Sequence, residues 1–402
     1  MKVGWETKTL GDVCEFQRGL TYAKSDEVDV SENIVLRATN IDLATNLLDF
    51  SELKYINEKV VVPASKKVKV GSLMICTASG SKSHLGKVAF IDEDYGYAFG
   101  GFMGMVTPCP ELQPKYLFYR MTSSDYKDFI AGLSDGANIN NLKFDDLQRF
   151  SIPYPPLPEQ QRIVAILDQA FAAIATARAH AEQNLQNARA VFDSHLQAVF
   201  SQRGDGWVET TIGATIKFID YRGKTPTKTE SGIRLITAKN IKMGYIQETP
   251  QEFIATDNYT TWMTRGIPKK GDVLFTTEAP LANVAQLDTN EKVAFAQRVI
   301  IMQPDVKRLD STFLKYLLLS PPVQKRIREK GTGATVQGIK ASLLKQIEIS
   351  FPKQLNQQQQ IISTLDTLRE QTQALESLYQ CKIAALDELK QSLLHQAFSG
   401  AL

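Results

Sequence analysis

Few residues of this chain have the types and spacing that covalent catalysis requires. Gly223-Lys224-Thr225 resembles the end of a phosphate-binding loop, but Phe218 stands where that loop needs a glycine. Tyr154-Pro155-Pro156-Leu157 and Ser320-Pro321-Pro322-Val323 contain adjacent prolines, as an amino-methyltransferase motif does. Both lack the following aromatic residue that stacks on a flipped base. We therefore expect this chain to carry no nucleotide site and to perform no covalent chemistry itself.

The histidines and cysteines also lack the spacing of a catalytic or metal site. The four histidines are His84, His180, His195 and His395. The last three fall in two long helical segments, where a solvated position or one at the edge of a seam is the simpler interpretation. The four cysteines are Cys14, Cys76, Cys109 and Cys381. Without a Cys-x-x-Cys pair they encode neither a disulfide framework nor a zinc site, and we interpret them as reduced thiols.

The elements that must position any functional side chain are written twice in this sequence. Residues 5–11 return as residues 207–213, and residues 157–168 return as residues 355–366. A repeat of about 200 residues is far longer than a solenoid unit, so each copy must fold as a domain with its own core. The chain is therefore expected to hold two similar domains.

Further anchors recur in the same order between those ends, whereas the segments between them diverge. The matched anchors are residues 38–41 with 238–241, 70–73 with 270–273, 115–117 with 315–317, and 142–143 with 339–340, the last preceded by Gly136-Ala137 and Gly333-Ala334. The divergence is greatest at 18–28 against 221–230 and at 77–87 against 276–284. One scaffold is therefore expected to carry two different sets of loops.

Short β-rich runs and a helix late in each copy indicate an α+β fold. The runs bounded by Gly, Asp and Ser are 33–37, 73–77 and 88–91 in the first copy and 233–237, 273–277 and 296–302 in the second. Helices are expected near residues 114–129 and near residues 311–330. The predicted fold class is α+β, with two mixed, β-rich domains.

A long helix is predicted after each copy, because Gly and Pro are absent for over 35 residues after Pro158 and after Asn356. Apolar residues repeat there with a step of seven, as at the a and d positions of a coiled coil. In the first segment the series are Ile163, Ala170, Ala177, Val191 and Leu167, Ile174, Ala181, Ala188. In the second segment they are Ile361, Leu368, Leu375, Leu389 and Leu365, Tyr379, Leu386, Leu393, interrupted by Thr372 and Lys382.

Each helix is expected to contain about 36 residues and to be about 54 Å long at 1.5 Å per residue. Because each helix leads away from its own domain, antiparallel pairing would bury both seams and place the domains at opposite ends, with approximate twofold symmetry. The predicted division is residues 1–157 for the first domain, 158–203 for the first helix, 204–354 for the second domain and 355–402 for the second helix.

The bulk composition indicates a globular, cytoplasmic protein with unequal charge in its two domains. The chain is 43% hydrophobic and 22% charged, and no run approaches the roughly 20 apolar residues of a membrane span. Its start lacks a signal-peptide core. Residues 1–158 hold 17 Lys and Arg against 20 Asp and Glu, a net −3, whereas residues 207–350 hold 21 against 14, a net +7. The basic second copy modestly favours a polyanionic partner.

The repeated residues resemble those of a known family. Each copy opens with a Trp-x5-Gly pattern, and the first copy ends in the run Pro155-Pro156-Leu157-Pro158-Glu159-Gln160-Gln161-Arg162-Ile163-Val164 before its long helix. This arrangement, present twice, is similar to the specificity subunit of type I restriction-modification enzymes over essentially the whole chain. The second copy departs from the run, with Asn356 for Pro158 and Gln357 for Glu159.

The resemblance implies a noncatalytic DNA reader without cofactors of its own. Each domain would be a target recognition domain that reads one half of a split, asymmetric DNA site, and the helices would act as a ruler for the unread spacer. The implied partners are double-stranded DNA, two modification subunits that bring S-adenosylmethionine and methylate adenine at N6, and two restriction subunits that use ATP and Mg²⁺. Two other classes stay open: a two-headed protein-binding scaffold without DNA specificity, and a methyltransferase in its own right.

Contacts to bases and phosphates would come from polar residues on the loops where the copies diverge. In the first domain the candidates are Arg18, Thr21, Tyr22, Lys24, Ser79, Lys82, His84, Asn138, Asn140, Asn141 and Lys143. In the second domain they are Tyr221, Arg222, Lys224, Thr225, Lys228, Glu278, Thr335, Gln337 and Lys340. The simpler alternative for any one of them is a solvated loop residue.

Two further groups have two interpretations each. Arg37 and Arg298 fall in strand-like runs and are compatible with a DNA contact or with a structural ion pair. Four glutamines stand at the helix starts, where they would cap the helix or contact a modification subunit. They are Gln160, Gln161, Gln358 and Gln359.

Overall fold

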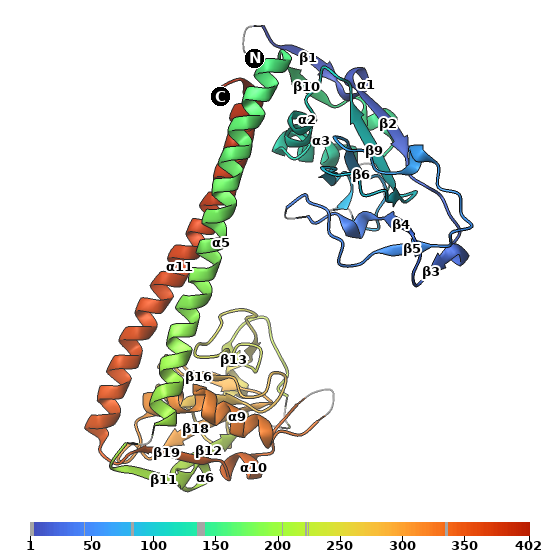
Figure 1. Cartoon of the computed structure of the whole chain (residues 1–402). Coiled ribbons are helices and arrows are strands. Elements are labelled where there is room, and N and C mark those ends of the chain that lie inside the picture. The colour runs from blue at the N-terminus through green and yellow to red at the C-terminus, as the bar shows by residue number, and fades with distance from the viewer. Residues whose placement is uncertain are drawn as a thin grey trace. The chain divides into compact units, whose positions relative to one another are not determined.

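The computed structural model describes residues 4–43, 45–81, 84–134, 141–202, 204–221, 223, 225–333 and 337–402. It forms two compact units, the first made of residues up to Ala181 together with Cys381–Leu402 and the second made of Glu182–Gln380. Each unit contains one copy of the repeat and part of both long helices (Figure 1). Each of the buried core clusters is confined to one unit.

The body of the first unit consists of two four-stranded sheets, a two-stranded ribbon and short helices. The first sheet has the antiparallel order β2 (Cys14–Arg18), β9 (Met103–Pro108), β6 (Leu73–Cys76), β7 (Val88–Phe90). The second has the order β3 (Glu27–Val28), β5 (Lys54–Ile56), β4 (Asn33–Leu36), β8 (Ala98–Phe99), with β4 and β8 parallel. The ribbon pairs β1 (Glu6–Thr9) with β10 (Ser151–Tyr154). The helices are α1 (Leu10–Val13), α2 (Pro114–Arg120), α3 (Ser124–Ser134) and α4 (Phe144–Leu147).

The second unit repeats this plan. Its antiparallel sheet has the order β12 (Ile216–Asp220), β18 (Val299–Pro304), β15 (Val273–Thr276), β16 (Val284–Gln286). The other sheet has the order β14 (Phe253–Ile254), β13 (Ile233–Ile236), β17 (Val293–Phe295), with β13 and β17 parallel. The ribbon pairs β11 (Trp207–Thr211) with β19 (Glu348–Pro352). The helices are α6 (Ile212–Thr215), α7 (Tyr259–Trp262), α8 (Ser311–Leu319), α9 (Pro321–Glu329) and α10 (Ala341–Lys345). The predicted α+β class with β-rich domains is confirmed.

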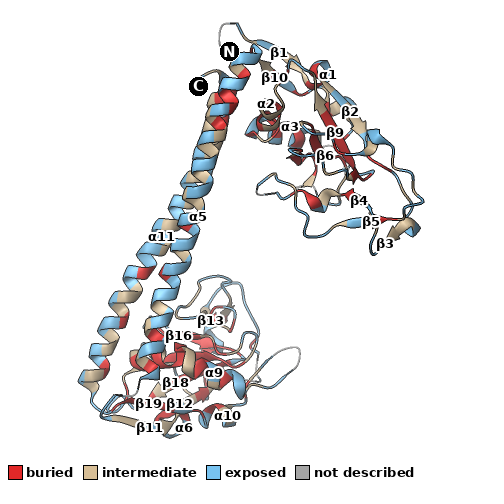
Figure 2. Cartoon of the chain, viewed as in Figure 1, coloured by how far each residue is buried: buried red, intermediate tan, exposed pale blue. Residues whose placement is uncertain are grey.

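The central strands explain how these layers hold together. Every residue of β15 is buried, because successive side chains of a strand point to opposite faces and both faces are covered. Phe275 packs in a cluster with Phe313 of α8, whereas Leu274 packs in a cluster with Leu235 of β13. Figure 2 shows buried residues concentrated on the strands of both units and a largely exposed surface on the two long helices. The sheet is therefore the middle layer, with helices on one face and the second sheet on the other.

The two long helices are longer than predicted. Helix α5 spans Leu157–Ser201 and α11 spans Leu355–Ser399, each of 45 residues and thus about 68 Å long. The expected 36 residues took only the lower bound of each run without Gly and Pro, whereas the predicted segments 158–203 and 355–402 contain nearly all of both helices. In the first unit Arg162 donates to the carbonyl of Leu402 at 2.7 Å, and Arg178 pairs with Asp387. In the second unit Arg189 Nε lies 2.9 Å from Glu376. In these contacts the residue number on α11 falls as the residue number on α5 rises. The two helices therefore run antiparallel within each unit, as predicted.

The seam between the helices follows only part of the predicted series. Ala181, Ala188 and Leu365 are buried, as expected. Val191 and Leu375 are 50% and 42% exposed, and Leu389, a third member, is 46% exposed. A strict step of seven drifts around an α-helix of 3.6 residues per turn, and a single partner helix covers only a narrow strip. The interrupting Thr372 is instead buried, with its hydroxyl donating to the carbonyl of Leu368 at 2.9 Å.

Three predicted elements differ in detail. The helix expected near residues 114–129 is broken into α2 and α3, and that expected near 311–330 is broken into α8 and α9. In the second case Ser320 adopts an extended conformation and the following prolines begin a new helix. The strand expected at residues 296–302 begins only at Val299, because Arg298 has a φ of 74° that is incompatible with a strand.

One anchor of the repeat was matched wrongly. The hydroxyl of Tyr119 donates to Asp168, and the hydroxyl of Tyr316 donates to the equivalent Asp366. Tyr316 therefore corresponds to Tyr119 and not to Tyr116, a shift of three residues. The neighbouring Lys-Tyr-Leu triplets produced the false match, since a shift of nearly one helical turn keeps the same face toward the core.

Candidate nucleic-acid interface

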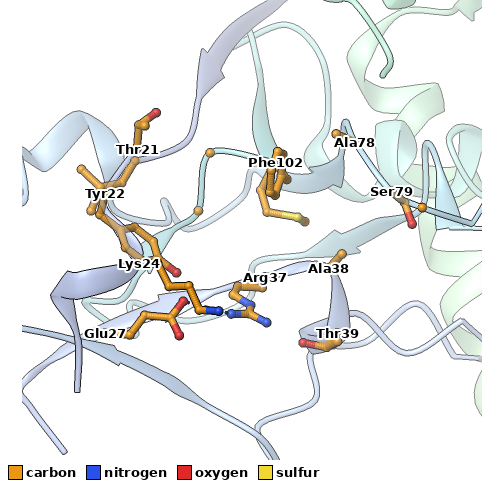
Figure 3. A pocket seen from close by; sticks show the side chains of 15 residues that line it. Thr21, Tyr22, Lys24, Glu27, Arg37, Ala38, Thr39, Ala78, Ser79 and Phe102 are labelled. Carbon is orange, nitrogen blue, oxygen red and sulfur yellow. Dashed lines mark ion pairs between the residues drawn. The ribbon is translucent and has the colours of Figure 1, made fainter. Parts of the chain in front are cut away.

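A cleft opens where several strands of the first domain begin or end. Its walls come from the loops that leave β2, β4 and β6 and from the turn between β8 and β9. The cleft has a volume of about 580 Å³ and is lined by side chains from segments 20–27, 37–39, 78–80 and 100–103. Figure 3 shows these segments around one space. Thr21, Tyr22, Lys24 and Ser79, which were predicted from separate loops, are thus brought together.

Two charged groups that line this first-domain cleft, Arg37 and Glu27, form an ion pair that is still accessible. Arg37 lies 3.5 Å from Glu27, and Lys54 lies 3.6 Å from the same carboxylate. The Arg37 side chain is 40% exposed and lines the cleft together with Lys24 (Figure 3). Exposed ion pairs of this kind are weak, so an incoming phosphate or base edge can compete for the cation. Arg37 is therefore an ion-pair partner that also faces the cleft.

Phe102 forms an apolar lip of the cleft. Its side chain is 73% exposed, although its backbone is firmly held. The carbonyl of Phe102 accepts from the backbone N–H of the buried Thr77 at 2.9 Å and from the Thr77 hydroxyl at 3.0 Å. The carbonyl of Thr77 in turn accepts from the N–H of Leu142 at 2.6 Å, which ties the segment of Asn141 and Lys143 to the same lip. Phe102 was not among the predicted contact residues, because its neighbours from Ala98 to Val106 are apolar residues and glycines, as in a buried strand.

The other described first-domain candidates are not among the residues that line this cleft, and three candidates lie outside the described residues. Asn141 and Lys143 are exposed, and the Arg18 guanidinium lies 5.4 Å from the ring of Phe144. The imidazole Nδ1 of His84 lies 3.5 Å from Lys87 Nζ. The candidates outside the described residues are Lys82, Asn138 and Asn140.

Lys87 is a buried cation of the first domain. Its Nζ donates to the carbonyl of Ile41 at 2.9 Å, and burial lowers the pKa of this ammonium group. Asn283 occupies the equivalent position in the second domain, and its Nδ2 donates to the carbonyl of Ile241 at 2.8 Å. Both side chains therefore hold the turn that follows the parallel strand β4 or β13, which is a structural role.

The second domain has a cleft at the equivalent place, with a different lining. Its volume is about 360 Å³, and its charged residues are Glu278, Arg298 and Lys340. Arg298 Nε donates to Glu278 Oε1 at 3.0 Å, and the two side chains are 44% and 45% exposed. The structure thus brings the predicted Glu278 and Lys340 into one site and adds Arg298 as an ion-pair partner.

The other second-domain candidates are dispersed. Tyr221 is only 1% exposed, and its hydroxyl donates to the carbonyl of Gly266 at 2.8 Å, so this ring packs in the core and cannot reach a ligand. Thr225 is exposed beside a separate small hollow, and Lys228 pairs with Glu252 at 2.8 Å. Gln337 is exposed. The candidates outside the described residues are Arg222, Lys224 and Thr335.

The glutamines at the helix starts divide into two kinds. Gln160 is fully buried, accepts from the N–H of Gln113 at 2.8 Å, and donates to the carbonyls of Pro155 and Glu111. Gln358 makes the same set of bonds, with the N–H of Asp310 at 2.8 Å and with the carbonyls of Pro352 and Arg308. Gln161 and Gln359 are exposed. The buried pair therefore locks each helix to its domain, and only the exposed pair is accessible to a partner.

Metal-ligand clusters and membrane spans are both absent from the described residues. Among the described residues, no group of three or more His, Cys, Asp or Glu side chains is arranged to hold a metal ion. Within that part of the chain, no helix is long and apolar enough to cross a bilayer. The cysteines are free, and burial raises the pKa of Cys14 to about 12.

The chain belongs to the family described as type I restriction modification DNA specificity domain, whose model matches residues 2–186 and 206–381. It is 26% identical to the StySPI specificity subunit of Salmonella potsdam and 25% identical to the EcoKI specificity subunit of Escherichia coli K12. Each alignment covers 99% of this chain and 89% of the relative. The resemblance inferred from the Trp-x5-Gly openings and the proline-rich run is confirmed.

Solved structures show the same fold. One is a chain from a study of complex assembly and conformational transition of the type I R-M system, with a TM-score of 0.80 and 20% identity over 100% of this chain and 99% of that one. Another is the HsdS subunit from Thermoanaerobacter tengcongensis, with a TM-score of 0.59 and 19% identity over 100% of this chain and 98% of that one.

Proposed function

We propose that this chain is the DNA-reading subunit of a type I restriction-modification complex and that each domain reads one half of a split, asymmetric site. The observation that carries the proposal is the pair of equivalent clefts with unlike linings. Tyr22, Lys24 and Phe102 line the first, whereas Glu278 and Arg298 line the second. Two domains that read the same half-site would need no such difference. Membership of the specificity family supports the assignment.

Phosphate contacts position the domains, and the clefts contact base edges. Helix α9 supports this division of labour in the second domain, since it presents the exposed cations Lys325 and Arg328 and is followed by Lys330. The net charge of +7 over residues 207–350 acts in the same direction, because the cations attract the duplex at long range.

The paired helices act as the ruler for the unread spacer. A helix of 45 residues is about 68 Å long, which corresponds to about 20 base pairs at 3.4 Å each. The buried amides of Gln160 and Gln358 support this role, because they fix each helix to the domain that it must position. The length of the helices then sets one fixed gap.

Two modification subunits bind this chain and carry S-adenosylmethionine for N6 methylation of adenine. Exposed apolar residues on the long helices support a docking role: Val191 is 50% exposed and Leu378 is 59% exposed. Restriction subunits that use ATP and Mg²⁺ complete the complex. The chain itself is noncatalytic and uses no cofactor.

The purified full-length chain tests this proposal. We expect it to bind duplex DNA with an affinity that falls steeply with salt and to show neither methylation nor cleavage on its own. Turnover by a rigorously pure preparation would contradict the noncatalytic role. Binding of proteins but not of DNA would favour the two-headed scaffold, and binding of S-adenosylmethionine by the chain alone, measured by calorimetry, would favour a methyltransferase.

A further inference from the structure

The residue that precedes β9 in the first domain and β18 in the second is held in the same way. The carbonyl of Phe102 accepts from the N–H of Thr77, and the carbonyl of Arg298 accepts from the N–H of Thr277, each at 2.9 Å. The next bond is also repeated, since the carbonyl of Thr277 accepts from the N–H of Ile339 at 2.9 Å. The two domains therefore present this side chain from equivalent points on the lips of equivalent clefts.

The chemistry presented there is opposite in the two domains. The first domain presents the exposed Phe102, and the residue that follows Thr77 is Ala78. The second presents Arg298, and the residue that follows Thr277 is Glu278, which pairs with it. The first lip is thus apolar, whereas the second carries a donor and an acceptor side by side.

The ion pair leaves the recognition edges of both groups free. Arg298 uses Nε for its bond to Glu278 Oε1, and no other described residue bonds its Nη1 or Nη2. Two parallel N–H donors on the Nη side match the O6 and N7 acceptors of guanine in the major groove. Glu278 Oε2 keeps the acceptor that the N4 amino group of the paired cytosine needs. The pair therefore keeps hydrogen-bonding groups that match both bases of one G·C pair.

Structural stability does not account for this arrangement. The two side chains are nearly half exposed, and exposed ion pairs contribute little to stability. Arg298 also has a φ of 74°, a conformation that favours glycine and is costly for a residue with a long side chain. The Arg298 backbone is strained, and the only described partner of its side chain is an exposed carboxylate, which points to a function outside the fold.

We propose that Arg298 and Glu278 together read one G·C base pair in the half-site of the second domain, with Arg298 donating to guanine and Glu278 accepting from cytosine. The inference rests on the proposed function, since it assumes that this cleft faces the major groove. Because Phe102 can neither donate nor accept, the first domain reads no guanine from the equivalent point. The two half-sites therefore differ in base composition for a stated chemical reason.

The test is selection from randomised duplex DNA by the full-length chain held with the modification subunits of the same cell. Wild-type complex is expected to select a bipartite motif with a G·C pair in one half. Arg298→Lys keeps the charge and loses the bidentate donor set, and Glu278→Gln keeps the shape and loses the charge. Each is expected to relax the preference at that one position by about 5-fold to 100-fold and to leave the other half unchanged.

Lys340→Ala is the matched control, because Lys340 is an exposed cation in the same cleft. It is expected to weaken binding to all sequences equally, as loss of a phosphate contact does. The double variant Glu278→Ala with Arg298→Phe, which copies the first domain, is expected to abolish the G·C preference.

Three outcomes are decisive. A G·C preference that survives both conservative variants would overturn the inference, as would a uniform loss of affinity at every position with unchanged thermal stability. If the double variant does not fold, the conservative variants decide alone. A wild-type complex that selects no motif would refute the proposed function itself.

Discussion

The buried amide of Gln358 gives the strongest prediction about how a domain is fixed to its helix. Gln358→Ala removes one accepted and two donated hydrogen bonds, all to backbone groups and all at 2.7–2.8 Å. At about 1 kcal/mol for each bond, and more for groups left buried and unsatisfied, the loss is about 3–4 kcal/mol. For a unit of this size that lowers the melting temperature by about 10 °C.

Scanning calorimetry with hydrogen exchange measures this effect. The exposed Gln359→Ala is the matched control and is expected to melt within about 1 °C of wild type, since exposed substitutions change stability little. Gln160→Ala is expected to destabilise the first unit by a similar amount. A Gln358→Ala variant that melts like Gln359→Ala would refute the argument that these amides lock the helices to the domains.

A charged analogue gives the same test a pH dependence. In Gln358→Glu the carboxylate can accept from the N–H of Asp310, but it faces two carbonyls to which it cannot donate. Burial against these carbonyls raises the folded-state pKa of the new carboxyl group above its ordinary value of about 4.3. The destabilisation is therefore expected to be small at pH 4 and to grow as the pH rises above the ordinary carboxyl pKa of about 4.3. A pH-independent loss would contradict this reasoning.

Further predictions concern the cleft, its backbone and the ruler. Lys87→Asn copies the second domain, keeps a donor for the carbonyl of Ile41 and removes a buried charge, so the variant should be at least as stable as wild type in urea. Burial lowers the pKa of Lys87, so the wild-type chain should gain stability relative to the variant as the pH rises toward the ordinary lysine pKa. A difference in the free energy of unfolding that stays constant with pH would argue against a buried cation. Arg298→Gly should raise stability by about 1 kcal/mol, because glycine accepts a φ of 74° without strain, while the G·C preference is lost; a destabilised variant would remove the strain argument. Deleting residues 175–181 together with 384–390 keeps the antiparallel register and shortens the two long helices by about 10 Å, or about 3 base pairs. The gap between the halves of the methylated motif should then shorten, or DNA binding should fail. An unchanged gap would exclude the ruler.

Much of the scaffold could be predicted from sequence because it depends on local pattern. The strands β6 and β15 begin at the predicted residues, and both long helices end shortly before the glycine, Gly204 or Gly400, that closes the run without Gly and Pro. The antiparallel pairing within each unit followed from the apolar series. The lengths were underestimated because the estimate took the lower bound of each run without Gly and Pro, although the helices continue to Ser201 and Ser399.

The composition of the clefts could be predicted only in part. Loop divergence singled out Thr21, Lys24 and Glu278, which line the clefts. It misplaced Tyr221, because whether a loop tyrosine turns inward depends on a distant partner, here the carbonyl of Gly266. It also missed Phe102, since an exposed aromatic residue has the same sequence signature as a core residue.

The central claim is that two unlike domains read two halves of one site at a fixed separation. The most direct measurement is a map of methylated adenines in DNA from the source cell, compared with the map from the same cell lacking this chain. We expect one motif that depends on the chain, with two different halves and a gap of constant length. A motif that is contiguous or palindromic, or whose gap varies from site to site, would contradict it.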